Sequence, residues 1–272
     1  MGSSLKQKKM KIVTVANQKG GVGKTSSIIQ LASGLAKRGE RVLAVDGDPQ
    51  GNLSLFFGAA EGQTFGQAAG QAKTPGFHDL LASIENGKPS LKNSIKKSVR
   101  RRLDLIPFTD RDFRINFADD RIRNLKDPFA KVLSKAADFY DWILIDSSPS
   151  NSCLERLLVE ASDAVIIPLE FQLFSVSGLE ASIQEVDACS QECGRGIEVH
   201  SLLFTKAENR LNRVQDYRRV FSTFRIPIFE VCKSEYMSRS LEKSRTIWEC
   251  GPSSNAAKDY ARIIEKSFLE IV

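Results

Sequence analysis

The sequence is poor in the features that would tie it to a membrane, a disulfide framework or a structural metal. No apolar run approaches the roughly 20 residues that a membrane-spanning helix needs, and residues 1–11 lack the apolar core of a signal peptide. The five cysteines are an odd number, with no CxxC pair and no nearby histidine that would indicate structural zinc. We therefore expect a soluble, cytoplasmic protein with reduced thiols.

The chain carries a modest excess of positive charge. The chain has 39 Lys and Arg against 33 Asp and Glu, a formal charge of +6, which favours polyanionic partners without specifying nucleic acid. Its 272 residues, 42% of them hydrophobic, suffice to bury the core of one large domain. We expect a flexible basic N-terminus over residues 1–10 and a single domain over residues 11–272.

Short β-branched apolar runs alternate with helical patterns along the whole chain. This alternation is typical of a parallel sheet covered by helices, and the near-continuous apolar character of the runs suits strands buried on both faces. The sequence predicts an α/β fold, with a mostly parallel twisted sheet flanked by helices on both faces. A helix is expected from Thr25 to about Gly39, and a loop over residues 58–77. The expected strands are 12–16, 41–46, 103–107, 142–146, 164–168, 199–204 and 226–231.

A glycine-rich segment between the first expected strand and helix has the composition of a phosphate-binding loop. Residues 18–26 read Gln-Lys-Gly-Gly-Val-Gly-Lys-Thr-Ser. Glycines allow the backbone N–H groups to approach phosphate oxygens, and the helix N-terminus favours an anion. Lys24 would neutralise the terminal phosphates, and the Thr25 hydroxyl would hold Mg²⁺. Gln18 stands where the strict GxxxxGK[ST] pattern has its first glycine. The alternative, an ordinary glycine turn before a helix, would have to account for the three glycines, the GKT ending and the position between strand and helix together.

Acidic residues follow two of the expected strands. Residues 45–52 read Val-Asp-Gly-Asp-Pro-Gln-Gly-Asn, and the apolar run 142–145 ends in Asp146. Both segments would lie at the carboxyl edge of the sheet, where open α/β folds place their ligands. An Asp-Pro turn and an apolar strand ending in Asp are each common in general, so the argument depends on their position beside the glycine-rich loop.

Residues 16–25 resemble the ParA/MinD family of deviant-Walker ATPases, whose signature KGGxGK[ST] begins with an additional lysine. Residues 45–52 are similar to the DxDPQGN segment of that family, and residues 142–146 look like its Walker B strand. The strand at 165–168 and the helix start at 175–179 also fit, so the resemblance covers roughly residues 11–268. Residues 147–150 keep only the second proline of the Pro-Pro-Ser turn usual in the family, which leaves the geometry of that loop open.

The resemblance implies an Mg²⁺-dependent ATPase that forms a homodimer around ATP, and it implies adenine as the base. Lys19 would reach the phosphates of the partner subunit's nucleotide, and Asp48 would orient the attacking water. The alternative for Lys19 is a solvated lysine at the start of a loop. The implied catalytic residues are Lys19, Lys24 and Asp48, and those near Mg²⁺ are Thr25, Asp46 and Asp146. The implied nucleotide-binding residues are Lys19, Gly20, Gly21, Val22, Gly23, Lys24, Thr25 and Ser26.

The stretch between residues 206 and 245 is rich in Arg and Lys. In ParA proteins the corresponding region contacts DNA, and phosphate contacts of this kind need no base readout. The resemblance therefore implies non-specific binding of double-stranded DNA, association with the nucleoid and a stimulating ParB-like partner. We interpret a second basic run, residues 96–102, as a solvated connection. The DNA contacts that we predict are Arg210, Arg213, Arg218, Arg239, Lys243 and Arg245.

Three alternatives stay open. A membrane-positioned ATPase of the MinD kind would use an amphipathic C-terminal helix; here Tyr260, Ile263, Ile264 and Phe268 have helical spacing, but acidic residues interleave with the basic ones. We favour core packing for that stripe and expect no stable membrane association. An iron–sulfur ATPase could use Cys153, although no second cysteine precedes it and the pair at 189 and 193 is not a CxxC. A non-catalytic adaptor that only binds nucleotide is the third.

Overall fold

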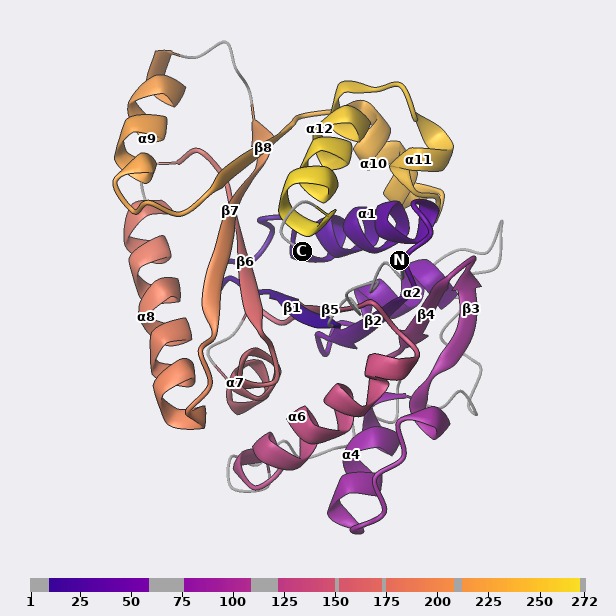
Figure 1. Cartoon of the computed structure of the whole chain (residues 1–272). Coiled ribbons are helices and arrows are strands. Elements are labelled where there is room, and N and C mark those ends of the chain that lie inside the picture. Colours follow the sequence, from indigo (N-terminus) through magenta and orange to yellow (C-terminus); the bar gives the residue numbers. More distant parts are fainter. Residues whose placement is uncertain are drawn as a thin grey trace, which may run out of the picture.

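An eight-stranded sheet forms the centre of the molecule (Figure 1). The computed structural model describes residues 10–58, 76–108, 122–149, 152–172, 175–207 and 212–269. The strand order is β3-β4-β2-β5-β1-β6-β7-β8, and every neighbouring pair is parallel except β3 with β4. The strands are β1 Lys11–Val15, β2 Val42–Gly47, β3 Lys96–Arg100, β4 Leu103–Ile106, β5 Trp142–Ser147, β6 Ala164–Leu169, β7 Glu198–Ala207 and β8 Ile228–Cys232.

Seven of these strands lie where the apolar runs predicted them. β2, β5 and β6 are buried along their whole length, as expected for strands covered on both faces. The interpretation of residues 96–102 as a solvated connection is wrong, because residues 96–100 form the edge strand β3, antiparallel to β4. Its charged residues gave no apolar signal, and charged edge strands of this kind discourage pairing with another chain.

Helices cover both faces of the sheet, which confirms the predicted fold class (Figure 1). α1, α2 and α10 to α12 pack on one face, while α4, α6 and α7 pack on the other. α8 and α9 continue this second layer over β6 and β7. Residues of β1 alternate between the faces: Val13 and Val15 belong to the first core, and Ile12 to the second.

The helix bounds agree with the expected start of the first helix and define the others. The Gly39 backbone has φ +98°, a left-handed conformation suited to the end of α1. Residues 59–75 of the predicted loop lie outside the described part of the chain, and helices begin or end on both sides of it. The helices are α1 Lys24–Lys37, α2 Asn52–Gly58, α4 Phe77–Glu85, α6 Lys126–Ser134, α7 Cys153–Glu160, α8 Ser175–Cys193, α9 Asn212–Ser222, α10 Glu235–Glu242, α11 Ile247–Cys250 and α12 Asn255–Ile263.

The C-terminal apolar stripe is part of the core. Tyr260, Ile263, Ile264 and Phe268 are buried in the same cluster as α1 and the strands, where they lie on α12 and on the π-helical segment Ile264–Leu269 that continues it. The preference for core packing over a membrane-facing helix is therefore confirmed. Among the described helices, none is both long and apolar enough to cross a bilayer. At the other end, Met10 is buried, although the sequence analysis places it in a flexible N-terminus.

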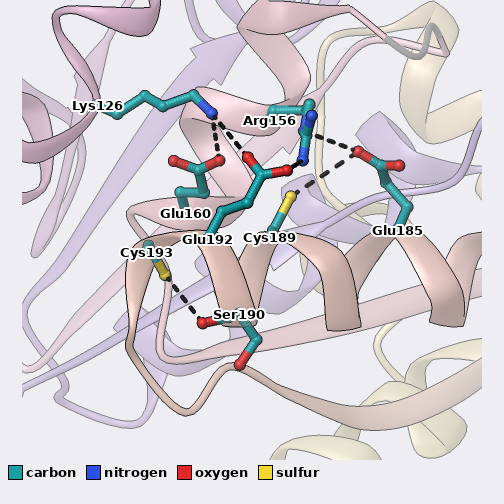
Figure 2. A network of polar contacts seen from close by, with 8 residues as sticks. All are labelled: Lys126, Arg156, Glu160, Glu185, Cys189, Ser190, Glu192 and Cys193. Atoms are coloured by element: carbon teal, nitrogen blue, oxygen red, sulfur yellow. Dashed lines mark hydrogen bonds and ion pairs between the residues drawn. The ribbon is translucent and has the colours of Figure 1, made fainter.

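A polar network fastens α7 to its neighbouring helices (Figure 2). The Lys126 ammonium of α6 donates to Glu160 of α7 over 2.5 Å, and the Arg156 guanidinium of α7 pairs with Glu192 and Glu185 of α8. The buried Cys189 thiol lies beside this network, and burial raises its pKa to about 11. The network holds the helix that follows β5 in place, and β5 carries one of the predicted carboxylates.

Candidate nucleotide-binding site

The strand order reverses direction at β1. From β1 the chain continues to β2, which lies beyond β5 on one side, and from β5 it later crosses β1 to β6 on the other side. In open α/β sheets, a crevice for ligands forms at such a point beyond the carboxyl ends of the strands. The glycine-rich loop begins there, immediately after Val15, and leads into α1 at Lys24.

The backbone of this loop has the conformation that an anion site requires. Gly21 and Gly23 adopt φ of +75° and +89°, which residues with a side chain rarely adopt. A Cβ at Gly23 would also lie 3.2 Å from the Thr205 Cγ2 atom. Gly23 is the N-cap of α1 and contributes no capping side chain, so the first N–H groups of the helix stay available to a bound anion.

Two neighbouring elements hold the loop in this shape. The Thr205 hydroxyl, from the end of β7, donates to the Val22 carbonyl over 2.9 Å. The Asn17 side chain donates to the Pro168 carbonyl over 2.6 Å and accepts from the Lys19 N–H over 2.8 Å. The Thr205 contact could not be predicted from the sequence, because it joins residues 183 positions apart.

The two lysines of the loop occupy opposite environments. Lys24 is 7% exposed, and its ammonium donates to the carbonyls of Asn17 and Lys19 over 2.8 and 3.0 Å, so it lies inside the curve of the loop. Burial lowers the pKa of Lys24, whereas the nearby carboxylates, Asp146 first among them, raise it. Lys19 is exposed at the rim, where its ammonium donates to the Gln172 side chain over 2.5 Å. The remaining predicted nucleotide-binding residues, Gly20, Val22, Thr25 and Ser26, belong to the same loop and to the first turn of α1.

Three predicted carboxylates meet beside the loop. The register of β2 and β5 places Asp46 directly opposite Asp146, and both side chains are fully buried. Asp46 accepts from the N–H and hydroxyl of Ser54, over 2.7 and 2.5 Å, and from the Asp48 N–H over 3.2 Å. Asp48 is 6% exposed and accepts from the Gln50 N–H over 2.9 Å. Ser54 was not among the predicted site residues, and its hydroxyl also accepts from the Phe108 N–H.

Burial dominates the protonation of these carboxyl groups. It raises the pKa of Asp46 to about 7 against the opposing hydrogen bonds from Ser54, and it raises the pKa of Asp48 less strongly. Burial, followed by the facing Asp46 carboxylate, raises the pKa of Asp146 well above its ordinary range, whereas the nearby Thr25 hydroxyl lowers it. A cation in this place would favour the charged form of all three groups.

Asp146 and Thr25 fit a hydrated magnesium ion. Neither carboxylate oxygen of Asp146 has a hydrogen-bond partner of good geometry among the described residues, although both oxygens are buried. The Thr25 hydroxyl lies near enough to lower the pKa of Asp146, but it forms no well-aligned hydrogen bond with either carboxylate oxygen. Unpaired carboxylate oxygens beside a hydroxyl and a phosphate-binding loop suit a cation that keeps several of its waters. In the described ranges, no group of three or more His, Cys, Asp or Glu side chains could hold a metal ion, so phosphate oxygens and water would have to complete the coordination.

A fourth acidic residue near the loop was not predicted. Glu155 on α7 is buried beside a small cavity of about 20 Å³ that Asn17 and Gln18 also line. Burial raises its pKa to about 8, although Lys24 opposes that shift. No signal in the sequence marks it, because it stands directly beside Arg156 on α7 and reads as one half of an ordinary charged pair.

The predicted DNA contacts belong to two segments that pack on different faces of the sheet. α9 packs with the core on the α8 side of the sheet, and α10 packs with the core on the α1 side. The Arg218 guanidinium forms two 2.6 Å contacts with Glu230, so its charge is already paired. Arg239 lies 3.6 Å from Glu235 and stays largely exposed, as do Lys243 and Arg245. Arg213 lies on α9, but its side chain and all of Arg210 are outside the described part of the chain.

The cysteines of the described chain form no cluster. Cys189 and Cys193 lie one turn apart on α8, Cys153 begins α7, and Cys232 and Cys250 line a separate hollow beside α12. All five are free thiols.

The sheet topology, the glycine loop and the convergent carboxylates together define a P-loop nucleotide-binding protein. The AAA domain family matches residues 10–199. The chromosome-partitioning ATPase Soj of Treponema pallidum is 32% identical over 216 residues, which cover 79% of this chain and 78% of Soj. The chain belongs to the ParA family of P-loop ATPases.

Solved structures of low sequence identity share the fold. An ATP complex of McdA from Cyanothece has a TM-score of 0.76 at 19% identity, covering 94% of this chain and 95% of that one. The septum site-determining protein MinD of Pyrococcus horikoshii, complexed with Mg-ADP, has a TM-score of 0.72 at 19% identity with the same coverage.

Proposed function

We propose that this protein is an ATP-switched dimer that binds DNA without sequence preference and positions a chromosome, plasmid or other cargo in the cytoplasm, at the nucleoid. The observation that carries the proposal is the contrast between its two loop lysines. Lys24 is enclosed by the loop and serves the nucleotide of its own chain. Lys19 stands exposed at the rim, where the phosphates of a nucleotide held by a second molecule could reach it.

The residues around the loop would have separate roles in the hydrolysis of ATP to ADP and phosphate. The loop N–H groups and Lys24 would bind the phosphates, and the partner subunit's Lys19 would offset the charge that develops on the transferred phosphoryl group. Asp48, which is buried but adjoins the loop, would orient the attacking water. Thr25, Asp146 and Asp46 would hold Mg²⁺, which supplies charge neutralisation to the phosphates when bound.

DNA binding would depend on dimer formation. The cations on α9 and those on α10 lie on different faces of one chain, so neither set is a large patch by itself. Joining two chains would enlarge the basic surface, which contains Arg239, Lys243 and Arg245 on the α10 side. Arg218 is better explained as a structural partner of Glu230. A ParB-like protein would stimulate hydrolysis and so end the DNA-bound state.

Retention of the protein on DNA tests the proposal. Immobilised duplexes of two unrelated sequences should hold the protein with ATP or a slowly hydrolysed ATP analogue, and release it with ADP. Because the binding comes from phosphate contacts, retention should fall steeply between about 50 and 200 mM salt and equally for both sequences.

Two variants sharpen the test. Asp48→Ala should remain on DNA with ATP for longer than the wild type, since its hydrolysis is blocked while its nucleotide binding persists. The double variant Arg239→Glu/Lys243→Glu should lose retention while keeping ATP affinity. Equal retention with ATP, with ADP and without nucleotide would refute the nucleotide switch.

A further inference from the structure

A basic pocket lies at the end of the sheet opposite the nucleotide site. It has a volume of about 600 Å³ and is enclosed by the last turn of α1, the turn between β3 and β4, and α11. It is lined by five cations, Lys37, Arg38, Arg100, Arg101 and Arg102, and by a single acid, Glu249. α1 spans the distance between the two sites, about 20 Å from Lys24 to Lys37 at 1.5 Å per residue.

Two of the five cations, Arg38 and Arg100, form contacts within the fold. The Arg38 guanidinium donates to the Gly34 and Ala261 carbonyls over 3.3 Å and lies 5.8 Å above the Trp248 ring. Arg100 donates to the Ser244 carbonyl over 3.0 Å. Glu249 accepts from the Thr246 N–H over 2.6 Å, as a cap of α11, and lies 3.7 Å from Arg100. These groups form a rigid wall.

The rest of the charge has no partner. Within the described ranges, the side chains of Lys37, Arg101 and Arg102 form no hydrogen bond or ion pair, and all three are exposed at the pocket. Arg102 occupies the turn with φ +61°, a conformation that costs an arginine more than it would cost glycine or asparagine. A strained arginine beside unpaired cations points to a role other than stabilising the turn.

The pocket also contains a polar group without a partner. Ser33 lines it from α1, is 8% exposed, and its hydroxyl has no hydrogen-bond partner among the described residues. Buried hydroxyl groups are nearly always satisfied, and an unsatisfied one costs about 1–3 kcal/mol. A ligand oxygen that reached Ser33 would remove that cost.

We infer that this pocket binds a small polyanion carrying two or more phosphate groups, at a second anion site that is separate from the P-loop. The volume suits a small ligand, since such sites measure about 300–1,000 Å³. Arg101 and Arg102 would form bidentate contacts with phosphate oxygens. The backbone of a DNA duplex would contact exposed cations alone and would not need the buried hydroxyl of Ser33.

Calorimetric titration with inorganic tripolyphosphate tests the inference. The full chain is saturated with ADP and Mg²⁺ beforehand so that the P-loop is occupied. The wild type should bind one tripolyphosphate per chain, with a change in tryptophan emission, because Trp248 lines the pocket and the other tryptophan, Trp142, is buried elsewhere. Arg101→Glu/Arg102→Glu should weaken binding at least about 100-fold, because two charge-assisted contacts are replaced by repulsion.

Further variants separate the pocket from the overall charge of the chain. Lys131→Glu/Lys135→Glu makes the same change in net charge on α6 and its following turn, and it should bind tripolyphosphate like the wild type. Lys37→Glu, at the exposed end of α1, provides an independent test should the double arginine variant fail to fold, and Ser33→Ala should weaken binding about fivefold. ADP affinity should stay unchanged in Arg101→Glu/Arg102→Glu.

A DNA-retention measurement on the same proteins distinguishes the two sources of phosphate. Tripolyphosphate binding that is lost in Arg101→Glu/Arg102→Glu, while that variant keeps its DNA retention, supports the inference. Absence of tripolyphosphate binding to the wild type overturns it, whether or not the variant also loses DNA retention. Equal binding by the wild type and the double arginine variant overturns it as well.

Discussion

Single carboxyl groups near the P-loop are held where water cannot solvate their charge. Asp46, Asp146 and Glu155 are all buried, and burial is the first cause of the raised pKa in each case. Asp46 and Asp146 face the place where a cation would bind, but Glu155 lies behind the loop on α7. The burial of a charged Glu155 should therefore lower the free energy of unfolding of the nucleotide-free protein.

Glu155→Gln should stabilise the nucleotide-free protein in a pH-dependent way. The pKa of Glu155 rises from 4.5 to about 8 on folding, so its contribution to stability is fully present below about pH 4.5 and is lost as the pH rises through about 8. Glutamine does not titrate and avoids that loss. Urea unfolding should show little difference between variant and wild type near pH 5, and a variant more stable by about 4 kcal/mol near pH 9.

Glu180→Gln on the exposed face of α8 serves as the control, and it should show no such pH dependence. If Glu155→Gln has the same stability as the wild type across this pH range, the carboxyl group titrates normally and the burial argument fails.

At the scale of elements, close packing of α1 depends on a glycine. A Cβ on Gly34 would lie 2.4 Å from the Ile264 Cδ1 atom and 2.6 Å from the Trp248 Cζ2 atom. Both contacts are too short, and the two neighbours are themselves packed in or against the core. Gly34 therefore fixes how closely α11 and the C-terminal helix approach α1.

Gly34→Ala should destabilise the protein by about 1–3 kcal/mol, measured as a lower midpoint of urea unfolding at constant m-value. This sign is opposite to the usual effect of replacing glycine by alanine inside a helix. Gly178→Ala on α8 is the matched control: a Cβ there meets nothing within 4 Å, and the change should stabilise by about 0.5–1 kcal/mol. Equal effects at the two positions would contradict the packing argument.

The sequence predicted the elements that carry apolar patterns and glycines, and it predicted the ends of strands where the site forms. Asp46 and Asp146 were placed at strand ends, and the register of β2 and β5 brings them face to face. β3 was missed because its residues are mainly charged, and edge strands need no apolar alternation to pair. Thr205 was missed because its contact with Val22 joins segments 183 positions apart. Ser54 lies only eight positions from Asp46, but its hydroxyl reaches that carboxylate only through the turn that the chain makes between β2 and α2.

For the molecule as a whole, nearness along the chain does not mean nearness in the fold. Residues 206–245 read as one basic stretch, but β8 runs through the middle of it and sends α9 and α10 to opposite faces of the sheet (Figure 1). Conversely, Lys37, Arg38 and Arg100 to Arg102 are far apart in sequence and meet at one pocket. Charge counted along a sequence does not show which face a residue will occupy, because that depends on the path of the strands.

The proposed role of Lys19 can be tested only in the dimer, where two molecules come together. In the single chain its ammonium is exposed, and among the described residues it donates to Gln172 only, over 2.5 Å. An exposed hydrogen bond of this kind contributes about 1 kcal/mol or less, so the side chain can leave it for a stronger partner at little cost. The phosphates of a nucleotide in a second subunit are such a partner, because they carry several charges within reach of one cation.

Lys19→Ala should therefore abolish dimer formation with ATP while changing ATP affinity of the single chain less than about threefold. Multi-angle light scattering after size exclusion, with ATP or its slowly hydrolysed analogue, should give a dimer for the wild type and a monomer for the variant. Lys131→Ala on α6, another exposed lysine, should dimerise like the wild type. A Lys19→Ala variant that still dimerises with ATP would show that Lys19 is only a solvated lysine at the rim of its own loop, and a variant that loses ATP binding altogether would show that it serves the nucleotide of its own chain.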